Sequence, residues 1–386
     1  MLYFTEHICS MEESRNPFRF SEPVPADELL DRDDETRILL ERARSGNNSR
    51  LAAPRRYGKT SLLTRVVEDA RRDGWAAVYI DFFGVLTLDD IARRIERAYA
   101  EQLQGRAATW FAGARRMLRP TLRLGGGPVP AGLEVAVDPQ AEPPLLERLA
   151  LPARLHERDG TRSLIVFDEF QDILVTKERA DAVIRSEIQH HGDAAGYVFA
   201  GSHVGMMREL FSDRRRAFYG QAAPLDLPPL PPDEVADYVA LRFAASDRAI
   251  GSALDALLEA SQGHPQRTML LAHLLWEFTE PGEEATEEIW LSAYDEAMHH
   301  VRDELRATWS ALPASQRRVL TAIAENREGI YAAGRRQGGS RGGAVRSALD
   351  SLRDRGDVVE DAATTSGWRL VDPLLATWVN EGRPGA

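Results

Sequence analysis

The feature that most constrains this chain is a loop in which glycine, lysine and threonine follow one another. Residues 51–61 read LAAPRRYGKTS, which matches the phosphate-binding pattern G-x-x-x-x-G-K-[ST] except at Ala53, where the pattern has glycine. Gly58 lets main-chain N–H groups close around a phosphate, Lys59 can reach the β- and γ-phosphates, and the Thr60 hydroxyl can bind Mg²⁺. Such a loop requires a strand before it and, after it, a helix whose positive end faces the anion.

The segments on either side of the loop have the required patterns. Residues 48–53 can form a short strand, and apolar side chains recur at helical spacing over 61–70. Ala53 is a departure, because alanine resists the positive φ that glycine adopts freely. If this position needs a positive φ, nucleotide affinity should suffer. Taken alone, the loop also has a simpler explanation, which is a chance GKT at the start of a helix.

A second motif is a short apolar run that ends in two acids. Residues 163–169, SLIVFDE, are typical of a buried parallel strand. Carboxylates at its C-terminal end point into the crevice where open α/β sheets bind ligands. We expect Asp168 to hold hydrated Mg²⁺ and Glu169 to orient and polarise the attacking water. A solvated acidic helix cap explains the two acids alone, but one nucleotide-binding mechanism explains both motifs.

Composition limits the class of protein. A length of 386 residues predicts two or three domains, and no apolar run approaches the length of a membrane span. The first 14 residues do not resemble a secretory signal. Cys9 is the single cysteine, so no internal disulfide framework or multi-cysteine metal site is possible, and a reducing cytoplasm is the expected location. A formal charge of −12 argues against a wholly basic nucleic-acid binder.

The order of the predicted elements indicates the fold class. Predicted strands at 48–53, 75–83, 163–169, 196–202 and 223–227 alternate with predicted helices at 26–45, 61–70, 88–103, 143–157 and 177–191. This alternation predicts an α/β fold, a P-loop NTPase with a mostly parallel sheet and helices on both faces. Alternating residues around a Gly-Gly-Gly-Pro sequence predict an inserted β-hairpin at about 119–137.

Changes in this pattern suggest domain boundaries. We expect an N-terminal tail and lead-in at 1–22, an ATPase core at 23–227, an all-helical lid at 228–306 and a winged helix-turn-helix domain at 307–386. The boundary after the core is the proline-rich sequence PPLPP at 228–232. The winged helix is predicted from two helical segments that precede a pair of strand-like segments near 358–360 and 368–371.

The last domain also has a local excess of positive charge. Between Pro313 and Ser347 there are seven arginines and two glutamates, a balance of +5 in an acidic protein. Several glycines there would let the segment approach a phosphate backbone. Double-stranded DNA is therefore one expected partner. A protein partner or self-association is the other, because winged helices also act as protein-docking modules.

With these motifs in order, the chain resembles the archaeal-type P-loop ATPases of the AAA+ and STAND branches, which are similar to initiator ATPases of the origin-recognition class. The matching stretches are NPF at 16–18, DRDDE at 31–35, PRRYGKTSLL at 54–63, FDEFQ at 167–171, GS at 201–202, GHP at 263–265 and VDPLLATW at 371–378. Together they cover nearly the whole chain. The resemblance implies ATP and Mg²⁺ as cofactors, and a lid and winged helix that move with nucleotide state.

The resemblance also implies roles for single residues. Ser202 matches a first sensor of the γ-phosphate, although a serine capping the next helix is equally plausible. Pro265 belongs to the lid motif, Arg32 lies where the family cradles adenine, and Arg267 matches a second sensor. The expected nucleotide-binding residues are Ala53, Pro54, Arg55, Arg56, Tyr57, Gly58, Lys59, Thr60, Ser61, Arg32 and Pro265. The expected catalytic residues are Glu169, Lys59 and Ser202, and the expected Mg²⁺ ligands are Thr60 and Asp168.

One part of the family pattern is missing. Similar proteins have an arginine after the Tyr-Gly that precedes the fifth strand, where this chain has Gln221. Arg214, Arg215 and Arg216 are nearby candidates for a charge-stabilising finger, with a solvated basic face as the alternative. A finger contributes about 10³–10⁵ in rate, so its absence would leave a slow ATPase or a nucleotide-gated interaction switch with negligible turnover. A small-molecule kinase is disfavoured by the winged C-terminus and the helical lid.

Overall fold

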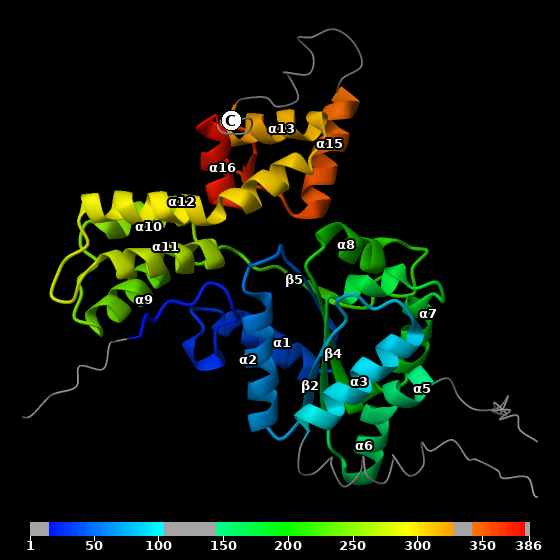
Figure 1. The fold of residues 1–386 in the computed structure, drawn as a ribbon. Coiled ribbons are helices and arrows are strands. Elements are labelled where there is room, and N and C mark those ends of the chain that lie inside the picture. The colour runs from blue at the N-terminus through cyan, green and yellow to red at the C-terminus, as the bar shows by residue number, and fades with distance from the viewer. Residues whose placement is uncertain (1–14, 104–143, 328–341, 383–386) are drawn as a thin grey trace, which may run out of the picture.

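The computed structural model describes residues 15–103, 144–327 and 342–382. It consists of a sheet domain, a group of long helices and a small C-terminal unit (Figure 1). Cys9 and the predicted hairpin at 119–137 lie outside the described residues. No helix among the described residues has the length and the apolar character needed to cross a membrane.

The sheet has five parallel strands and confirms the predicted α/β class. Its strands are β1 (Ser49–Ala52), β2 (Ala76–Asp81), β3 (Ser163–Asp168), β4 (Ala195–Gly201) and β5 (Ala223–Leu225), in the spatial order β2-β3-β4-β1-β5. Asp81 pairs with Asp168, and Ala52 pairs with Gly201. The carboxyl ends of β1, β3 and β4 therefore meet at one edge, where open α/β sheets bind ligands.

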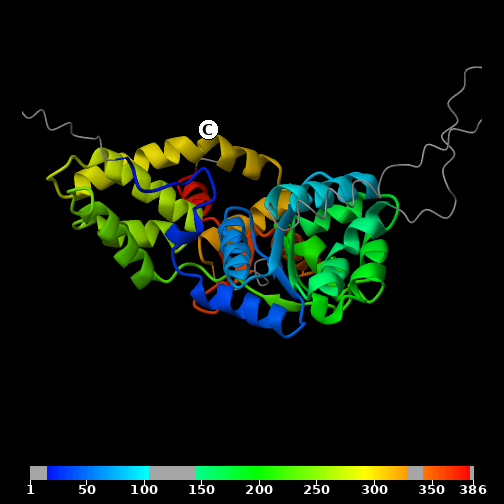
Figure 2. The same ribbon diagram turned by 90° about the horizontal axis from the view of Figure 1, so that it is seen from below.

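Helices cover both faces of this sheet (Figures 1 and 2). They are α1 (Asp33–Arg44), α2 (Lys59–Arg72), α3 (Leu88–Gln102), α5 (Pro144–Leu149), α6 (Leu151–Asp159), α7 (Ala180–Ile188) and α8 (Val204–Ser212), with 3-10 turns at Ala26–Glu28, Phe170–Val175 and Gly192–Ala194. Alternate residues of β3 explain the two layers. Leu164 and Val166 pack with α1 and α2, whereas Ile165 and Phe167 pack with α3 and α5–α8.

Two of the predicted helices are interrupted. The helix expected at 26–45 is a 3-10 turn followed by α1, because Asp31 and Arg32 have φ of 56° and 78° and so break the right-handed helix between them. The helix expected at 143–157 is the pair α5 and α6, which are separated at Ala150. The other predicted elements of the core occur within a few residues of their expected bounds.

The remaining helices and the C-terminal unit share one hydrophobic core. The helices are α9 (Pro232–Ala244), α10 (Ala253–Ser261), α11 (Pro265–Phe278) and α12 (Glu287–Ser310). The C-terminal unit contains α13 (Ala314–Ala324), α15 (Gly342–Arg355), the antiparallel pair β6 (Val358–Glu360) and β7 (Trp368–Leu370), and α16 (Pro373–Asn380). One buried cluster includes Leu271, Val301, Leu320, Leu352 and Trp378. The boundary predicted at residue 306 falls inside α12.

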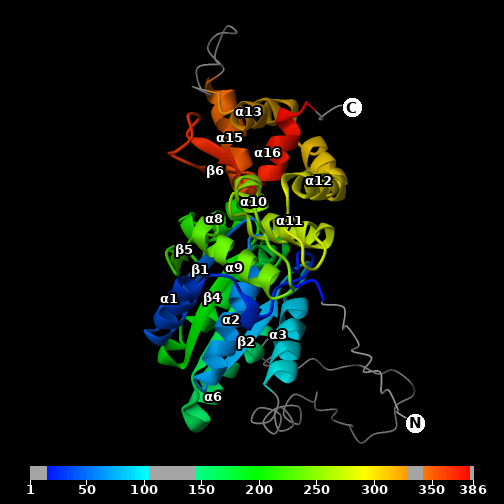
Figure 3. The ribbon, with the colours of Figure 1, turned by 90° about the vertical axis from the view of Figure 1, so that its left-hand side faces the viewer.

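The C-terminal unit also contacts the sheet domain, and it lies at the opposite end of the molecule from α6 (Figure 3). Helix α15 packs against α8, where Arg208 forms an ion pair with Asp354. A Cβ added to Gly205 of α8 would lie 2.6 Å from Cβ of Asp354, so only glycine permits this approach without a shift. The next turn places Gly356, with φ of 81°, against Pro54 of the phosphate loop.

Candidate nucleotide-binding site

The phosphate loop joins β1 to α2, as its sequence predicts. Gly58 has φ of 82° and is the N-cap of α2, and Arg56 also has a positive φ, of 63°. Ala53 is not among the positive-φ residues; it is buried, and its N–H donates to the Gly201 carbonyl at 3.3 Å. The expected loss of affinity at Ala53 therefore has no structural basis, because the left-handed turn falls three residues later.

A cavity of about 250 Å³ opens beside this loop. Its walls come from the lead-in, the loop with the start of α2, and the first turns of α11: Arg19, Phe20, Ser21, Glu22, Pro23, Val24, Arg56, Gly58, Lys59, Thr60, Ser61, Pro265, Gln266 and Met269. The N–H of Val24 donates to Ser61 Oγ at 3.0 Å, which ties the lead-in to α2. The N-terminus of α2 favours an anion here.

The lead-in is anchored on the helical group. Phe18 is buried, with ring centroids 6.3 Å from Tyr238 and 5.7 Å from Phe243 of α9. Asn16 donates to the His273 carbonyl at 3.1 Å, and the Phe18 carbonyl accepts from His273 Nδ1 at 2.7 Å. One wall of the cavity is therefore attached to the helical group.

Glu169 directly follows β3, and three donors converge on one of its two carboxylate oxygens. Its Oε2 accepts from Ser202 Oγ at 2.7 Å, from Ser202 N at 3.3 Å and from Gln171 Nε2 at 2.5 Å, and its Oε1 lies 3.7 Å from Lys59 Nζ. Burial alone would raise the pKa of Glu169, but these hydrogen bonds and the Lys59 charge outweigh it and lower the pKa. The structure thus brings together the three residues predicted to be catalytic.

Ser202 does not cap the next helix, which was its alternative role. The N-cap of α8 is His203, whose ring accepts from Met206 N at 3.3 Å. Ser202 is buried and is committed to Glu169.

The predicted Mg²⁺ ligands lie on β3 and α2, and one tyrosine connects them. Asp168 is buried; its Oδ1 accepts from Glu169 N at 2.9 Å and its Oδ2 from the Tyr79 hydroxyl at 2.5 Å. Burial and the Asp168 carboxylate raise the pKa of Tyr79 far above its usual value, and a hydrogen bond with Thr60 opposes them. Throughout the described ranges no three His, Cys, Asp or Glu side chains gather as a metal cluster. One carboxylate and one hydroxyl are what a Mg²⁺ carried by nucleotide phosphates needs, so these residues fit the ion.

Two solved structures have a similar overall fold over nearly the whole chain. A Walker-type ATPase of Pyrococcus abyssi is 16% identical, with 94% of this chain and 99% of that chain covered at a TM-score of 0.67. The ORC2 protein of Aeropyrum pernix in its ADPNP–ADP complexes is 18% identical, with 95% and 98% covered and a TM-score of 0.55. The chain has an archaeal Orc-like P-loop ATPase fold. No protein-family model and no curated protein matches the sequence, so the likeness is one of fold.

Arg32, expected near adenine, does not line the cavity of this ATPase fold. It is buried, and its guanidinium donates to Glu35 Oε1 at 3.0 Å and to the Pro228 carbonyl at 2.7 Å. The side chain fastens the start of α1 to the segment that leaves the sheet domain. Sequence reasoning missed this role because Pro228 is 196 residues away.

A second cavity of about 520 Å³ lies between the phosphate loop, α11 and the C-terminal unit. Pro54, Arg55 and Arg56 line it together with Ser202, His264 and Arg355. The expected nucleotide-binding residues Pro54 and Arg55 therefore face the C-terminal unit rather than the first cavity. Of the loop residues, Arg56 lines both cavities.

An ion-pair relay crosses the second cavity and includes the predicted second sensor. Arg267 is only 1% exposed, and its guanidinium contacts Glu304 Oε1 at 3.1 Å and Asp372 Oδ2 at 2.5 Å. Glu304 also pairs with Arg56 of the phosphate loop. Arg267 thus serves as a tie to the C-terminal unit and not as a group that faces the first cavity.

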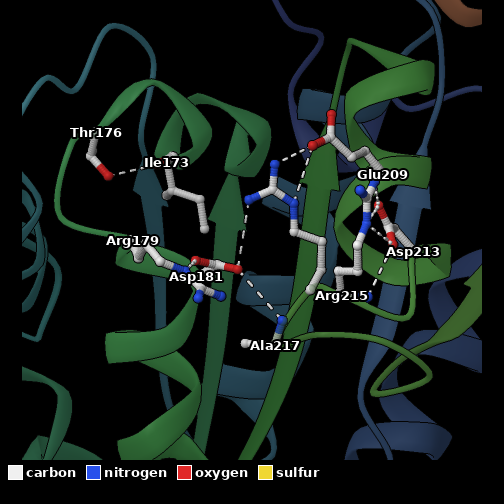
Figure 4. A network of polar contacts seen from close by, with 9 residues as sticks. Ile173, Thr176, Arg179, Asp181, Glu209, Asp213, Arg215 and Ala217 are labelled. Atoms are coloured by element: carbon white, nitrogen blue, oxygen red, sulfur yellow. Dashed lines mark hydrogen bonds and ion pairs between the residues drawn. The ribbon is translucent and has the colours of Figure 1, made fainter.

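The three candidate finger arginines differ in their surroundings, and Figure 4 shows the contacts between Arg215 and Asp213 together with the nearby Asp181 and Glu209. Arg215 Nη2 contacts Asp213 Oδ2 at 2.7 Å, and Arg216 donates from Nε to Glu209 Oε1 at 3.1 Å. The buried Asp181 lies 3.9 Å from Arg216 Nη1 and accepts from Ala217 N at 3.5 Å. Arg214 is exposed, and the described part of the chain gives it no ion pair. Two of the three candidates are therefore held by carboxylates of their own chain.

Three residues that contact the predicted site residues escaped sequence reasoning: Tyr79, Gln171 and Glu304. Gln171 belongs to the matching FDEFQ stretch and lies two residues after Glu169, but that stretch alone does not predict its hydrogen bond to Glu169. Tyr79 gives a weaker signal, because it sits on a predicted strand two residues before Asp81. Glu304 gives none, since it lies on a long helix far from the loop in sequence.

Proposed function

We propose that this protein binds ATP with Mg²⁺ in the 250 Å³ cavity and hydrolyses it slowly, and that the bound nucleotide controls the helical lid and the C-terminal unit. One observation carries the proposal: Lys59, Glu169 and Ser202 meet at the edge of the sheet beside the left-handed turn at Gly58. An ammonium group, a helix N-terminus and a carboxylate in one place match the needs of phosphoryl transfer to water.

The chain's own residues divide the work. Main-chain N–H groups of the loop and Lys59 hold the phosphates, and Thr60 and Asp168 would hold Mg²⁺. When bound, Mg²⁺ neutralises charge that develops on the phosphate oxygens. Oε1 of Glu169, which faces Lys59, accepts none of the bonds from Ser202 and Gln171, whereas Oε2 must give them up before that oxygen can orient a water molecule. Release of Ser202 in that step would leave its hydroxyl free to contact the γ-phosphate.

The direct test compares ATP turnover of the wild-type protein with that of Glu169→Gln. We expect the variant to keep its nucleotide affinity by calorimetry and to lose about 10²–10⁴-fold in turnover, the usual contribution of a positioned acid or base. Ser186→Ala, an exposed change on α7 far from the sheet edge, is the matched control. Equal rates in wild type and Glu169→Gln would remove Glu169 from the mechanism.

A second candidate is a nucleotide-gated interaction switch with negligible turnover. It is favoured by the three hydrogen bonds that occupy Glu169 Oε2 and by the commitment of Arg215 and Arg216 to carboxylates. Tight ATP binding without phosphate release, together with a partner retained only when ATP is bound, would support this candidate over the ATPase.

Control of the C-terminal unit is supported by the relay from Arg56 to Asp372. A nucleotide in the first cavity would lie beside Arg56, and a shift of that side chain would alter its ion pair with Glu304. The charge network would then pass the change to Arg267 and Asp372, which is the N-cap of α16.

Contact with double-stranded DNA stays a prediction, as do a protein partner and self-association. Within the described ranges, Arg317 donates to the Trp309 and Ser310 carbonyls, and Arg327 pairs with Glu325. Of the arginines of this segment that the structure describes, Arg318 and Arg346 are therefore the candidates for phosphate contacts. If the C-terminal unit binds DNA, the affinity for DNA must fall steeply as the salt concentration rises. Arg346→Ala must then reduce the slope of log affinity against log salt concentration by about one. Binding that does not depend on salt would favour a protein partner.

A further inference from the structure

We propose that Tyr79 is a positioning residue for the Mg²⁺-binding carboxylate, whose hydroxyl holds Asp168 ready for the metal that ATP brings. The inference rests on the proposed function, since it assigns a role within the same site. It concerns a residue on a neighbouring strand that the phosphate-loop and acidic-strand motifs do not contain.

The main chain of Tyr79 is held from outside the sheet. Among the described strands β2 lies at the edge of the sheet, so one side of its backbone pairs with none of them. Gln102 of α3 fills that place: its Oε1 accepts from Tyr79 N at 2.9 Å and its Nε2 donates to the Tyr79 carbonyl at 2.6 Å. Arg71 in turn donates to Gln102 Oε1 at 2.9 Å and to the Ala77 carbonyl at 2.9 Å. The backbone of Tyr79 is therefore held in place independently of the contact that its hydroxyl makes.

The register of the sheet aims the ring at Asp168. Tyr79 pairs with Val166 and Asp81 pairs with Asp168, so Tyr79 and Asp168 are diagonal neighbours on the same face of adjacent strands. That face is the one covered by α1 and α2, where Tyr79 packs against the buried cluster. From there the hydroxyl reaches Asp168 Oδ2 at 2.5 Å, the length of a strong hydrogen bond to a carboxylate.

The carboxylate is thereby fixed at both oxygens. Its Oδ1 accepts from Glu169 N at 2.9 Å and its Oδ2 from Tyr79, so rotation about the Cβ–Cγ bond would break both bonds. Each oxygen still has a lone pair for a second donor, such as a water molecule of hydrated Mg²⁺. Mg²⁺ demands near-ideal octahedral geometry, and partners that orient a metal's ligands typically change affinity or activity about 10–100-fold.

A purely structural role makes a different prediction. If Tyr79 only fills the space between β2 and α2, phenylalanine would serve as well, because it keeps the ring and removes the oxygen alone. If the hydroxyl orients Asp168, phenylalanine must weaken the response to Mg²⁺ and leave metal-free nucleotide binding intact.

The experiment measures the affinity for ADP by calorimetry, first in EDTA and then over a Mg²⁺ titration, for the wild type and Tyr79→Phe. We expect affinity in EDTA within about twofold of wild type and a half-saturating Mg²⁺ concentration about 10–100-fold higher. Tyr197→Phe is the matched control, because it removes a buried hydroxyl that lies 2.6 Å from His191 near the start of β4. It should change neither quantity.

Two results would overturn the assignment: an unchanged Mg²⁺ dependence in Tyr79→Phe, or an equal loss of affinity in EDTA and in Mg²⁺. In an Asp168→Asn background, Tyr79→Phe should add no further change in Mg²⁺ dependence, and an additive change would also count against it. Should Tyr79→Phe fail to fold, Gln102→Ala tests the same claim, because it frees the main chain and keeps the hydroxyl. Wild-type protein that binds no ADP either in EDTA or in saturating Mg²⁺ would instead defeat the proposed function.

Discussion

The two cavities beside the phosphate loop are built from different chemistry. The smaller cavity is lined by the lead-in, the glycine turn and the first turn of α11. Its lysine, Lys59, lies 3.7 Å from the Glu169 carboxylate, which follows β3. The larger is crossed by ion pairs between side chains from the loop, two helices and the C-terminal unit. Main-chain donors together with cationic side chains such as Lys59 suit a phosphate ligand, whereas ion pairs between separate elements suit a structural tie. Arg56 lines both cavities, so a ligand that moves this side chain in the smaller cavity would also change the ion pairs in the larger one.

The largest effect should come from breaking the ion-pair relay between the phosphate loop and the C-terminal unit. Arg267→Gln would leave Asp372 and Glu304 without their buried cation, and loss of one partner of a buried ion pair costs about 3–5 kcal/mol. We expect that decrease in the free energy of unfolding by urea titration. Arg44→Gln, which breaks the half-exposed pair with Asp73, should cost about 1 kcal/mol or less. Equal effects of the two changes would mean that the relay is not a structural tie.

The next effect belongs to the binding side. Lys59→Ala removes the buried ammonium group, and hydrogen bonds to charged groups contribute about 1.5–3 kcal/mol. We expect ATP affinity by calorimetry to fall on the order of 100-fold. The control is Lys177→Ala, an exposed lysine outside both cavities, which should bind ATP as the wild type does. Undiminished affinity in Lys59→Ala would place the nucleotide elsewhere.

A third effect depends on pH and concerns the lid side of the loop. Burial lowers the pKa of His264 to about 4, although Asp372 opposes it; Arg267 and Arg369 add to the lowering, and the ring lies edge-on to Tyr57. The unfolded state binds more protons than the folded state between about pH 6.5 and 4, so stability is lost as pH falls through that window.

This titration predicts a loss of about 2 kcal/mol between pH 7 and pH 5 from His264 alone. In the wild type, the His264 imidazole Nδ1 accepts a hydrogen bond from Arg267 N at 3.3 Å. In His264→Asn the amide oxygen can accept that bond, and the side chain does not titrate. Urea unfolding at both pH values should therefore show a smaller difference for the variant. An identical pH dependence for both proteins would contradict burial of a neutral imidazole.

The smallest effect should come from the contact between α8 and α15. Gly205→Ala would place a methyl group against Asp354 and cost about 1 kcal/mol of docking, near the lower limit for overpacking. We expect a larger separation between fluorescent labels on α8 and α13. Gly343→Ala on α15 meets no atom within 4 Å and is the matched control. An unchanged separation in Gly205→Ala would show that the contact tolerates the methyl group.

The sequence predicts much of the sheet domain and little of the connection. The run SLIVFD is apolar on both faces, so it specifies a buried parallel strand wherever it lies, and the acids at its end then share an edge with the loop. The pairing of Arg56 with Glu304 depends on how two distant elements pack, and no local pattern encodes it. The backbone at Ala53 was likewise unpredictable, because the left-handed turn lies at Arg56 and Gly58 instead.

Amide hydrogen exchange with and without Mg²⁺ and ATP tests the central claim most directly, because it reports both sides of the loop in one experiment. We predict slower exchange at 19–24 and 53–63, and a simultaneous change in exchange at 264–270 and 371–376. Exchange that is unaffected at 53–63 in saturating nucleotide would contradict the binding site. Protection confined to the loop and lead-in, with 371–376 unchanged, would contradict the connection.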